Sequence, residues 1–516
     1  MSIATFPLRR PGDARPRLLP PIGVLLLVAL SMVVLFGAAS LGMAVEVSGL
    51  AAAVVLGWVV WRWPTQSAIA LVVLIPMARF ISFAVFVPTH SSTLLRASQL
   101  WKDEAIIVLA ARMVHGAFLR GRLPHVHFID VLIAGFIGLT GMYLFYPGII
   151  AGSTYFVRAL AFRQDALYLL VYFIGRGITL RRRDVKAMFV ALIAMSVVIA
   201  VVAGFEFALP GLSNRIFTKL GYPAFQSALG TAFETESVRT RVLESGTLPR
   251  ASSLFLADLG LAFYLVLLIP LAAALFFAFR TRASQFWSGL FLLAMIATMG
   301  LTVARAPLVG ALAGLVVLIF LSRSFIKASW VAIGVAAMVI LFLVVSGYSF
   351  GVFRALYSAQ DSSASAHTGY ISRSIGLVAS HPLGEGLGNG SHVSVLAKGL
   401  GQGALPSWAT ETWYLQLGLE MGVVAMLLFA ALLLVATCNS LLSGVRVRDP
   451  WLRALSLGVA GGGVGYILVS AFHPVWSAVQ VSYLFWLFVG IAIRAPRLES
   501  EWEAEEASGD EHRDRP

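Results

Sequence analysis

Long apolar runs separated by short polar connections make up most of this chain. The runs are about 15–30 residues long, and about 20 apolar residues are enough for an α-helix to cross a bilayer. We therefore expect an all-α, polytopic transmembrane helical bundle of about fourteen spans. The expected spans cover residues 22–44, 47–61, 66–88, 103–119, 128–147, 165–180, 186–209, 253–279, 286–302, 307–322, 329–347, 413–442, 455–472 and 477–493.

The composition supports a membrane protein. The chain is 59% hydrophobic and 12% charged, whereas soluble domains contain roughly 25% charged residues. The first run, 22–45, is too long for a signal peptide, and further spans follow it. The single cysteine, Cys438, excludes an internal disulfide framework and a cysteine-based metal site.

The net charge of +13 comes largely from arginines in short connections between spans, so nucleic-acid binding is not implied. The positive-inside rule places these connections and both termini in the cytoplasm. We expect a disordered basic tail at 1–20, a transmembrane domain at 21–498 and a disordered acidic tail at 499–516. The arginines of the expected inner connections are Arg62, Arg120, Arg122, Arg181, Arg182, Arg183, Arg280, Arg282, Arg323, Arg446, Arg448 and Arg453.

Two expected loops on the outer side of the membrane are long, 210–252 and 347–412, and a shorter one covers 147–164. Loops longer than about 15 residues are usually functional or disordered. The second long loop contains a glycine-rich turn at 384–390 and then a polar run that leads into the helix at 413. Its glycines allow backbone angles closed to other residues, which suits either a surface turn or a loop packed tightly against something.

Arginines on the outer side run against the charge bias and need a reason. A planar guanidinium binds phosphate oxygens bidentately, although any one of these side chains could instead extend to the membrane interface. Arg305 has the least room to do so, because it lies in a minimal turn between two apolar helices. The other outer arginines singled out are Arg158, Arg163, Arg215, Arg239, Arg241 and Arg250.

Four carboxylates lie near the expected outer face. Glu411 follows Thr410, a candidate N-cap, so it is either an acid or base or a partner of the helix dipole. Glu420 lies in apolar surroundings and should pair with a buried partner. Glu206 and Asp258 are candidate counter-ions for the arginines, or contacts to a sugar.

The histidines do not have the spacing of a metal site, and we expect neither a metal nor a cofactor. His473, in a tight outer turn, faces the same compartment as Glu411, and His381 opens the glycine-rich turn. No Walker loop, dinucleotide fingerprint, nucleophile elbow or DxD signature is present. A transferase of this kind would take a donor other than a soluble nucleotide sugar.

Four motifs in order resemble the O-antigen ligase and polymerase superfamily, which are integral membrane glycosyltransferases that use polyprenyl-diphosphate-linked donors. The resemblance covers roughly residues 160–490. The motifs are PRASSLF at 249–255, TVARA at 302–306, HPLGEGLG at 381–388 and ETWYLQLGLEMG at 411–422.

The chain departs from the family pattern at four positions. Ala304 and Ala306 replace the Ser and Gly that flank the turn arginine. Glu411 stands where ligases carry a histidine, and Thr412 stands in the Asn position. Loss of that histidine argues against a lipid A-core ligase and favours a polysaccharide polymerase.

The resemblance implies glycosyl transfer at the periplasmic face of the bacterial inner membrane, as in O-antigen or exopolysaccharide biosynthesis. The donor would be a glycan on undecaprenyl diphosphate and the acceptor a lipid-linked repeat unit, without a metal. Glu411, Arg305 and Arg250 would be catalytic. A chain-length regulator and a flippase are the implied partners. The substrate-binding residues would be Arg158, Arg163, Arg239, Arg241, His381 and His473.

Two alternatives stay open. One is the ligase or protein O-oligosaccharyltransferase branch of the same superfamily, which differs in the acceptor. The other is a transporter of lipid-linked glycans, which could use the intramembrane residues Arg79 and Arg112. An ion channel is less well supported, because no pore-lining ring or filter motif is present.

Overall fold

The computed structural model describes residues 45–119, 126–146, 154–229, 236, 238–243, 246–321, 329, 362–391, 393 and 410–511. The expected spans at 22–44 and 329–347 and the basic tail at 1–20 lie outside these residues. The side chains of Arg239 and Arg241 also lie outside the described set.

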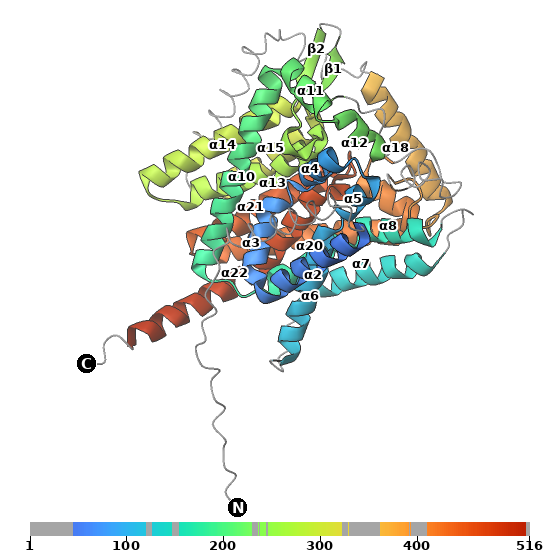
Figure 1. Cartoon of the computed structure of the whole chain (residues 1–516). Helices are drawn as coiled ribbons and strands as arrows, with labels where there is room; N and C mark the ends of the chain where they lie inside the picture. The colour runs from blue at the N-terminus through green and yellow to red at the C-terminus, as the bar shows by residue number, and fades with distance from the viewer. Residues whose placement is uncertain are drawn as a thin grey trace, which may run out of the picture.

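The described residues form helices with one small hairpin (Figure 1). The strands β1 (Arg239–Leu243) and β2 (Gly246–Arg250) pair antiparallel, with Arg239 opposite Arg250. The helices are α2 (Val45–Arg62), α3 (Pro64–Leu74), α4 (Ala78–Thr89), α5 (Ser92–Ala97), α6 (Trp101–Leu119), α7 (Phe128–Phe145), α8 (Tyr155–Asp165), η1 (Leu167–Leu169), α9 (Leu170–Gly177), α10 (Arg182–Ala208), α11 (Pro210–Lys219), α12 (Tyr222–Ala228), η2 (Ser253–Phe255), α13 (Asp258–Ala278), α14 (Arg282–Thr302), α15 (Arg305–Leu321), α18 (Ser362–Ser380), α20 (Trp413–Arg446), α21 (Pro450–Val469), η3 (Val475–Ser477) and α22 (Val479–Glu511).

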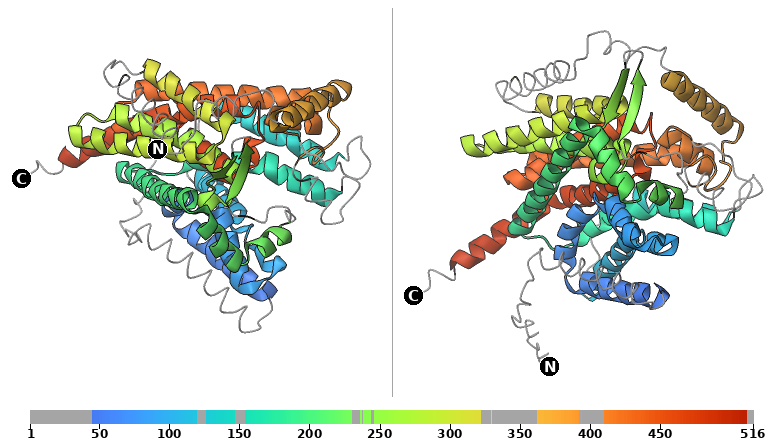
Figure 2. Two further views of the ribbon diagram at one scale, coloured as in Figure 1. Left: turned by 90° about the horizontal axis from the view of Figure 1, so that it is seen from above. Right: turned by 45° about the horizontal axis from the view of Figure 1, so that its top comes forward.

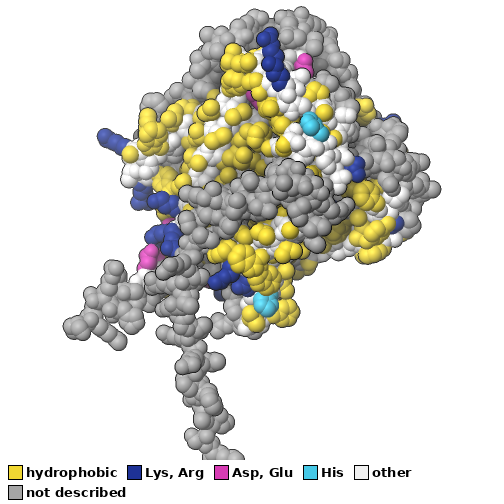
Figure 3. All heavy atoms as spheres, viewed as in Figure 1, with side chains coloured by type: hydrophobic (Ala, Val, Ile, Leu, Met, Phe, Trp, Pro, Cys, Tyr) yellow, Lys and Arg dark blue, Asp and Glu magenta, His cyan; other side chains and the backbone are white. Residues whose placement is uncertain are grey.

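Seven described helices are long and apolar enough to cross a membrane, namely α7, α10, α13, α14, α20, α21 and α22. Large apolar side chains face outward from the bundle, and Phe118 and Phe320 are 76% and 85% exposed. Apolar side chains cover much of the described surface in Figure 3. The chain is an all-α helical membrane protein, although the described residues do not reach the expected fourteen spans.

The expected span at 66–88 is two helices rather than one. α3 and α4 meet at an angle of 78°. Pro76 lies in the break between them, and its ring and missing N–H interrupt a helix. The hydropathy pattern gives the length of an apolar stretch but does not show whether its helix is bent, so the bend could not be predicted from it.

The core of the bundle is a close contact of α13, α15 and α21. A Cβ added at Gly461 of α21 would lie 2.8 Å from the Cβ of Pro270 in α13, and one added at Gly310 of α15 would lie 2.9 Å from the carbonyl oxygen of Gly465. Only glycine allows backbones to approach this closely. α13 is the most buried of the seven candidate spans, because 83% of its apolar stretch lies inside the protein.

Two hydrogen bonds show how the helices run relative to one another. The Tyr466 hydroxyl near the end of α21 donates to the Phe263 carbonyl near the start of α13, at 3.0 Å. The Trp413 N–H at the start of α20 donates to the Ser470 carbonyl that follows α21, at 3.0 Å. α13, α15 and α20 therefore begin at the end of the bundle where α21 finishes, which we call the Arg305 end. The opposite end, where α10 and α21 begin, is the Arg182 end.

Two expected irregular segments are partly regular. The loop expected at 210–252 contains α11, α12 and the β-hairpin, which lies at the top of Figure 1. The tail expected to be disordered at 499–516 is instead helical through Glu511, because α22 continues and projects with the C-terminus (Figure 2). Trp502 holds this extension, since its Nε1–H donates to the Leu180 carbonyl at 2.9 Å and its side chain is buried.

Candidate functional site

The first candidate feature is a junction at the Arg305 end, where the end of β2 meets the turn between α14 and α15. The Arg250 Nε donates to the Thr302 carbonyl at 3.1 Å. An Arg250 Nη2 lies 2.6 Å from the buried Asp258 carboxylate. The Ala251 N–H also donates to the Leu301 carbonyl, at 3.0 Å. The expectation that Asp258 serves as a counter-ion for an arginine is confirmed, and that arginine is Arg250.

The backbone of this arginine junction is strained. Among the described residues, four that are not glycine have φ in the left-handed region: His90, Ser253, Leu256 and Val303. The last three flank Arg250, Asp258 or Arg305 in sequence. Such angles cost about 1–3 kcal/mol each and persist where the surroundings enforce them, commonly at functional sites.

Glu206 helps to hold this strained backbone in place. Its Oε2 accepts hydrogen bonds from the N–H groups of Ser252 and Ser253, at 2.8 and 2.7 Å. The Ser253 hydroxyl donates to the Ile199 carbonyl at 2.8 Å. Glu206 is fully buried and orders the backbone that follows Arg250.

Arg305 begins α15, two residues after the left-handed Val303 that caps α14. Thr302 lies between the two arginines of interest, because its carbonyl accepts from Arg250 and its chain leads directly into Arg305. The expected short connection between two apolar helices is confirmed, but it consists only of Val303 and Ala304, and Arg305 is the first residue of α15 rather than part of the turn. Binding of one anion by both arginines stays a prediction.

The second feature is a break in α20 that the glycine-rich turn covers. At Gly422, φ is 83° and ψ is 175°, so the expected continuous helix at 413–442 is interrupted. The Glu385 N–H donates to the Leu419 carbonyl at 2.7 Å and the Gly386 N–H to the Glu420 carbonyl at 3.0 Å. These carbonyls are ones that the break leaves without a helical partner.

The glycines of this turn have a steric reason. Gly384 has φ of 80°, and a Cβ there would lie 2.6 Å from the Gly422 nitrogen. The Val423 N–H also donates to the Pro382 carbonyl, at 2.9 Å. Tight packing of residues 381–391, which we call the glycine segment, against another element is confirmed.

The start of α20 differs from expectation in its cap. Thr412, not Thr410, is the N-cap, because its backbone is extended and its hydroxyl accepts from the Leu415 N–H at 3.2 Å. Thr410 instead donates its N–H to the Gly390 carbonyl at 2.6 Å. Glu411 therefore precedes the cap and is not in the first helical turn. It is half-buried at the Arg305 end.

The two candidate histidines have different surroundings. His473 follows α21 at the Arg305 end, and its ring lies 5.6 Å from the Phe263 ring of α13. His381 lies in the glycine segment, where its Nδ1 is 3.2 Å from a Glu385 oxygen. Burial raises the pKa of the Glu385 carboxyl, and His381 opposes that rise. The sequence reading did not anticipate this histidine–carboxylate contact.

The remaining candidate arginines have partners within the fold. The Arg163 Nε donates to Asp103 at 2.8 Å, and the Tyr483 hydroxyl donates to the same carboxylate at 2.7 Å. An Arg158 Nη1 donates to the Leu144 carbonyl at 3.0 Å. Arg163 is thus part of a contact between helices, and a role in substrate binding for either residue stays a prediction.

One buried residue was missed altogether. Asp165, at the end of α8, has no exposed surface and accepts from the Gln416 Nε2 at 3.2 Å. Its carboxyl also contacts that of Glu420, so the expected buried partner of Glu420 is confirmed and is another acid. The only signal in the sequence was an aspartate at the edge of an apolar run.

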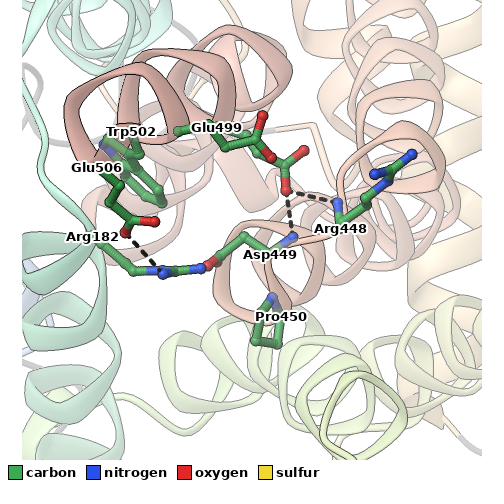
Figure 4. Close-up of a pocket in the computed structure, with 8 residues that line it drawn as sticks. Arg182, Arg448, Asp449, Pro450, Glu499, Trp502 and Glu506 are labelled. Atoms are coloured by element: carbon green, nitrogen blue, oxygen red, sulfur yellow. Dashed lines mark hydrogen bonds and ion pairs between the residues drawn. The ribbon is translucent and has the colours of Figure 1, made fainter. Parts of the chain in front are cut away.

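A cavity of about 180 Å³ lies at the opposite, Arg182 end (Figure 4). Within it, Arg182 pairs with Asp449 at 2.8 Å and with Glu506 at 3.2 Å, and Glu499 accepts from the Arg448 N–H at 2.9 Å. The carboxylates of this cavity therefore tie α22 to α10 and α21, far along the bundle from the arginine junction.

Known proteins do not decide between these features. Neither the models of protein families nor the curated proteins include one that matches the chain. In the part of the chain that the structure describes, no three His, Cys, Asp or Glu side chains gather closely enough to hold a metal ion. The functional proposal consequently rests on the geometry at the Arg305 end.

Proposed function

We propose that this protein is a polysaccharide polymerase of the membrane, which transfers a glycan from undecaprenyl diphosphate onto a lipid-linked repeat unit at the periplasmic face. The observation that carries the proposal is the arginine junction, where Arg250 is fixed against the turn that leads to Arg305. Glu411 and His473 lie at the same end of the bundle. The resemblance to the O-antigen ligase and polymerase superfamily supports the same reaction.

In this reaction a hydroxyl of the acceptor sugar attacks the anomeric carbon of the donor. The new bond joins that oxygen to the carbon, and the bond between the carbon and the phosphate oxygen breaks. Glu411, as a carboxylate, takes the hydroxyl proton. The diphosphate leaves with the electron pair, and Arg250 and Arg305 stabilise its charge.

The contacts of Arg250 suit that task. A guanidinium has five N–H donors, and the bonds to Thr302 and Asp258 hold two of its nitrogen atoms in place. These bonds fix the orientation of the side chain, and a preorganised charge stabilises a leaving group at little reorganisation cost. Arginine stays charged at physiological pH, so this stabilisation does not depend on the protonation of the side chain.

We also propose the orientation of the protein in the membrane and its partners. The Arg305 end would face the periplasm of a bacterial inner membrane, with both termini in the cytoplasm. The lipid bilayer holds the prenyl tails of both substrates, and a flippase would deliver them. A chain-length regulator would act on the growing glycan. Transfer to a lipid A core or to a protein is the alternative within the same chemistry.

The test uses the purified protein in lipid nanodiscs with undecaprenyl-diphosphate-linked repeat units. We expect polymer to form, and Arg250→Ala to reduce it strongly. Arg215→Ala is the matched control, because Arg215 is an exposed arginine of α11, which adjoins the arginine junction through α10. If the lipid-linked glycans keep their original length after incubation with the wild-type protein, polymerase activity is contradicted.

A transporter of lipid-linked glycans is the second candidate, and the broken helices favour it. α20 is interrupted at Gly422, and α3 and α4 are bent by 78°. Interrupted helices are common at the substrate sites of transporters. Reconstitution into vesicles separates the two, since a transporter would move fluorescent lipid-linked glycan between leaflets without changing its length.

A further inference from the structure

Two buried acids and a buried amide lie together near the break in α20. Asp165, Gln416 and Glu420 each have no exposed surface. The Gln416 Nε2 donates to one Asp165 oxygen at 3.2 Å. Two carboxyl groups from elements 255 positions apart in the sequence are thereby brought into contact where water does not reach.

Both acids cannot be ionised there at a reasonable cost. Like charges in contact repel, and each also loses its hydration on burial. The charged groups on the neighbouring elements are engaged elsewhere, so none neutralises the pair. Tyr168 of η1 lies close to Asp165 and is neutral at physiological pH. The other titratable groups on the surrounding elements bond elsewhere, and they are Arg158 and Arg163 of α8, Tyr143 of α7, Tyr483 of α22, and His381 and Glu385 of the glycine segment.

The hydrogen bonds point to a proton rather than a metal cation. Gln416 donates to Asp165, and the Ser391 hydroxyl and the Gly388 N–H donate to Glu420, but no hydrogen lies between the two carboxyls while both acids are ionised. The polar neighbours of Glu420, apart from Asp165, are the Ser391 hydroxyl and the Gly388 N–H. The Gly388 N–H and the Gln416 amide N–H donate hydrogens and cannot coordinate a cation, so they suit an acid and its conjugate base.

We propose that Asp165 and Glu420 bind one proton between them, and that this proton holds the glycine segment closed over the break in α20. The proton, carried by one carboxyl, makes that group a donor to the other, so the two carboxyls attract rather than repel. The glycine segment contributes Gly388 and Ser391 to the same site and covers the Leu419 and Glu420 carbonyls. This inference does not depend on the reaction proposed above.

Opening of the glycine segment should depend on pH in one direction. When the glycine segment lifts, water reaches the carboxyls, and a solvated glutamate with its ordinary pKa of about 4.3 is ionised at neutral pH. Opening therefore releases one proton and closing takes one up. The closed form is favoured at low pH, and the opening equilibrium should increase about tenfold for each pH unit across the neutral range.

Hydrogen exchange of the full-length protein in nanodiscs tests this. The Glu385, Gly386 and Val423 amides bond across the break, so their protection reports opening. After correction for intrinsic exchange, we expect wild-type protection to fall about tenfold per pH unit between about pH 6 and 8. Glu420→Gln, which replaces the acid by a neutral group of equal size, should show no such slope.

The matched control is Glu385→Gln, a carboxyl in the same segment that contacts His381 instead of the pair. We expect it to keep the wild-type slope. A flat profile in the wild type, or a slope that persists in Glu420→Gln, would overturn the proposal. Protection that follows Na⁺ concentration at fixed pH, with choline as the replacement cation, would show a cation site instead.

A second measurement needs no folded variant. Infrared spectroscopy of the wild type at pH 7 should show the carbonyl band of a protonated carboxylic acid that shifts in D₂O. This band should disappear over the same pH range in which protection is lost. If all carboxyl groups absorb as carboxylates at pH 7 while the amides remain protected, the shared proton does not exist.

Discussion

Arg250 and Thr302 are 52 positions apart in sequence, yet the Arg250 guanidinium donates to the Thr302 carbonyl at 3.1 Å. This bond joins the end of the hairpin to the turn before Arg305. It means that the turn between α14 and α15 is held from outside the two helices. A change at either arginine therefore acts on one shared structure, and the predictions below use that relation.

We expect Arg305→Lys to be nearly as damaging as Arg305→Ala. Lysine keeps the charge but loses the planar fork that binds two phosphate oxygens. Loss of a charge-assisted contact costs roughly 1.5–3 kcal/mol, or about 10–150-fold in donor binding or rate. Polymer yield and donor binding are measured for both variants, with Arg215→Lys as the control. Full activity of Arg305→Ala at normal expression would make this arginine an interfacial anchor.

Glu411→Gln should lower polymer formation by about 10²–10⁴-fold, the usual effect of losing a general base. The carboxylate lies just before the N-cap of α20 at the end of the bundle that holds both arginines. Glu236→Gln is a suitable control, because Glu236 is exposed. Normal polymer from Glu411→Gln at equal protein level would direct attention to His473 as the base.

The orientation in the membrane is testable by cysteine labelling in a Cys438→Ser background. We expect Ser363→Cys to react with an impermeant thiol reagent in intact cells whose outer membrane has been opened. Ala507→Cys, an exposed position of the α22 extension, should react only after the inner membrane is permeabilised. The reverse pattern would invert the topology and remove the periplasmic site.

Gly422→Ala should destabilise the protein by about 1–3 kcal/mol from the backbone angle alone, because φ there is 83°. The added methyl would also press on the backbone of the glycine segment, since a Cβ would lie 2.8 Å from the Leu383 Cα. Gly376→Ala in α18 is the control, with nothing within 4 Å of the new Cβ. Thermal unfolding in detergent measures both. Equal stability of the two variants would mean that the break closes without strain.

Trp502→Ala should loosen the Arg182 end. The indole is buried and bonds the Leu180 carbonyl, and replacing a buried Trp by Ala typically costs about 3–5 kcal/mol. The exposed neighbour Glu503 supplies the control Glu503→Ala, which should have little effect. Protease sensitivity after residue 498 measures release of the helix. Resistance equal to that of the wild type would show that the charged contacts hold it without Trp502.

Local patterns in the sequence determine much of this molecule. Runs of apolar residues specify helices wherever they occur, because a helix satisfies its own backbone hydrogen bonds in lipid. The turn before Arg305 also follows from a short stretch, whereas the glycines at 384–390 left open whether that segment is a surface turn or packs against another element. The positions of Arg305, Glu411 and His473 at one end follow from helix lengths alone.

Contacts between distant segments could not be predicted in this way. The break at Gly422 depends on N–H groups of Glu385 and Gly386 that replace helical ones, and the Asp165–Glu420 pair depends on α8 packing against that break. The α22 extension was expected to be disordered from its charge, but Trp502 and the carboxylates bind groups on α21 and the segment before α10. In each case a buried polar group finds its hydrogen-bond partner on a segment that is distant in the sequence. Such partners come together only once the helices have packed against one another.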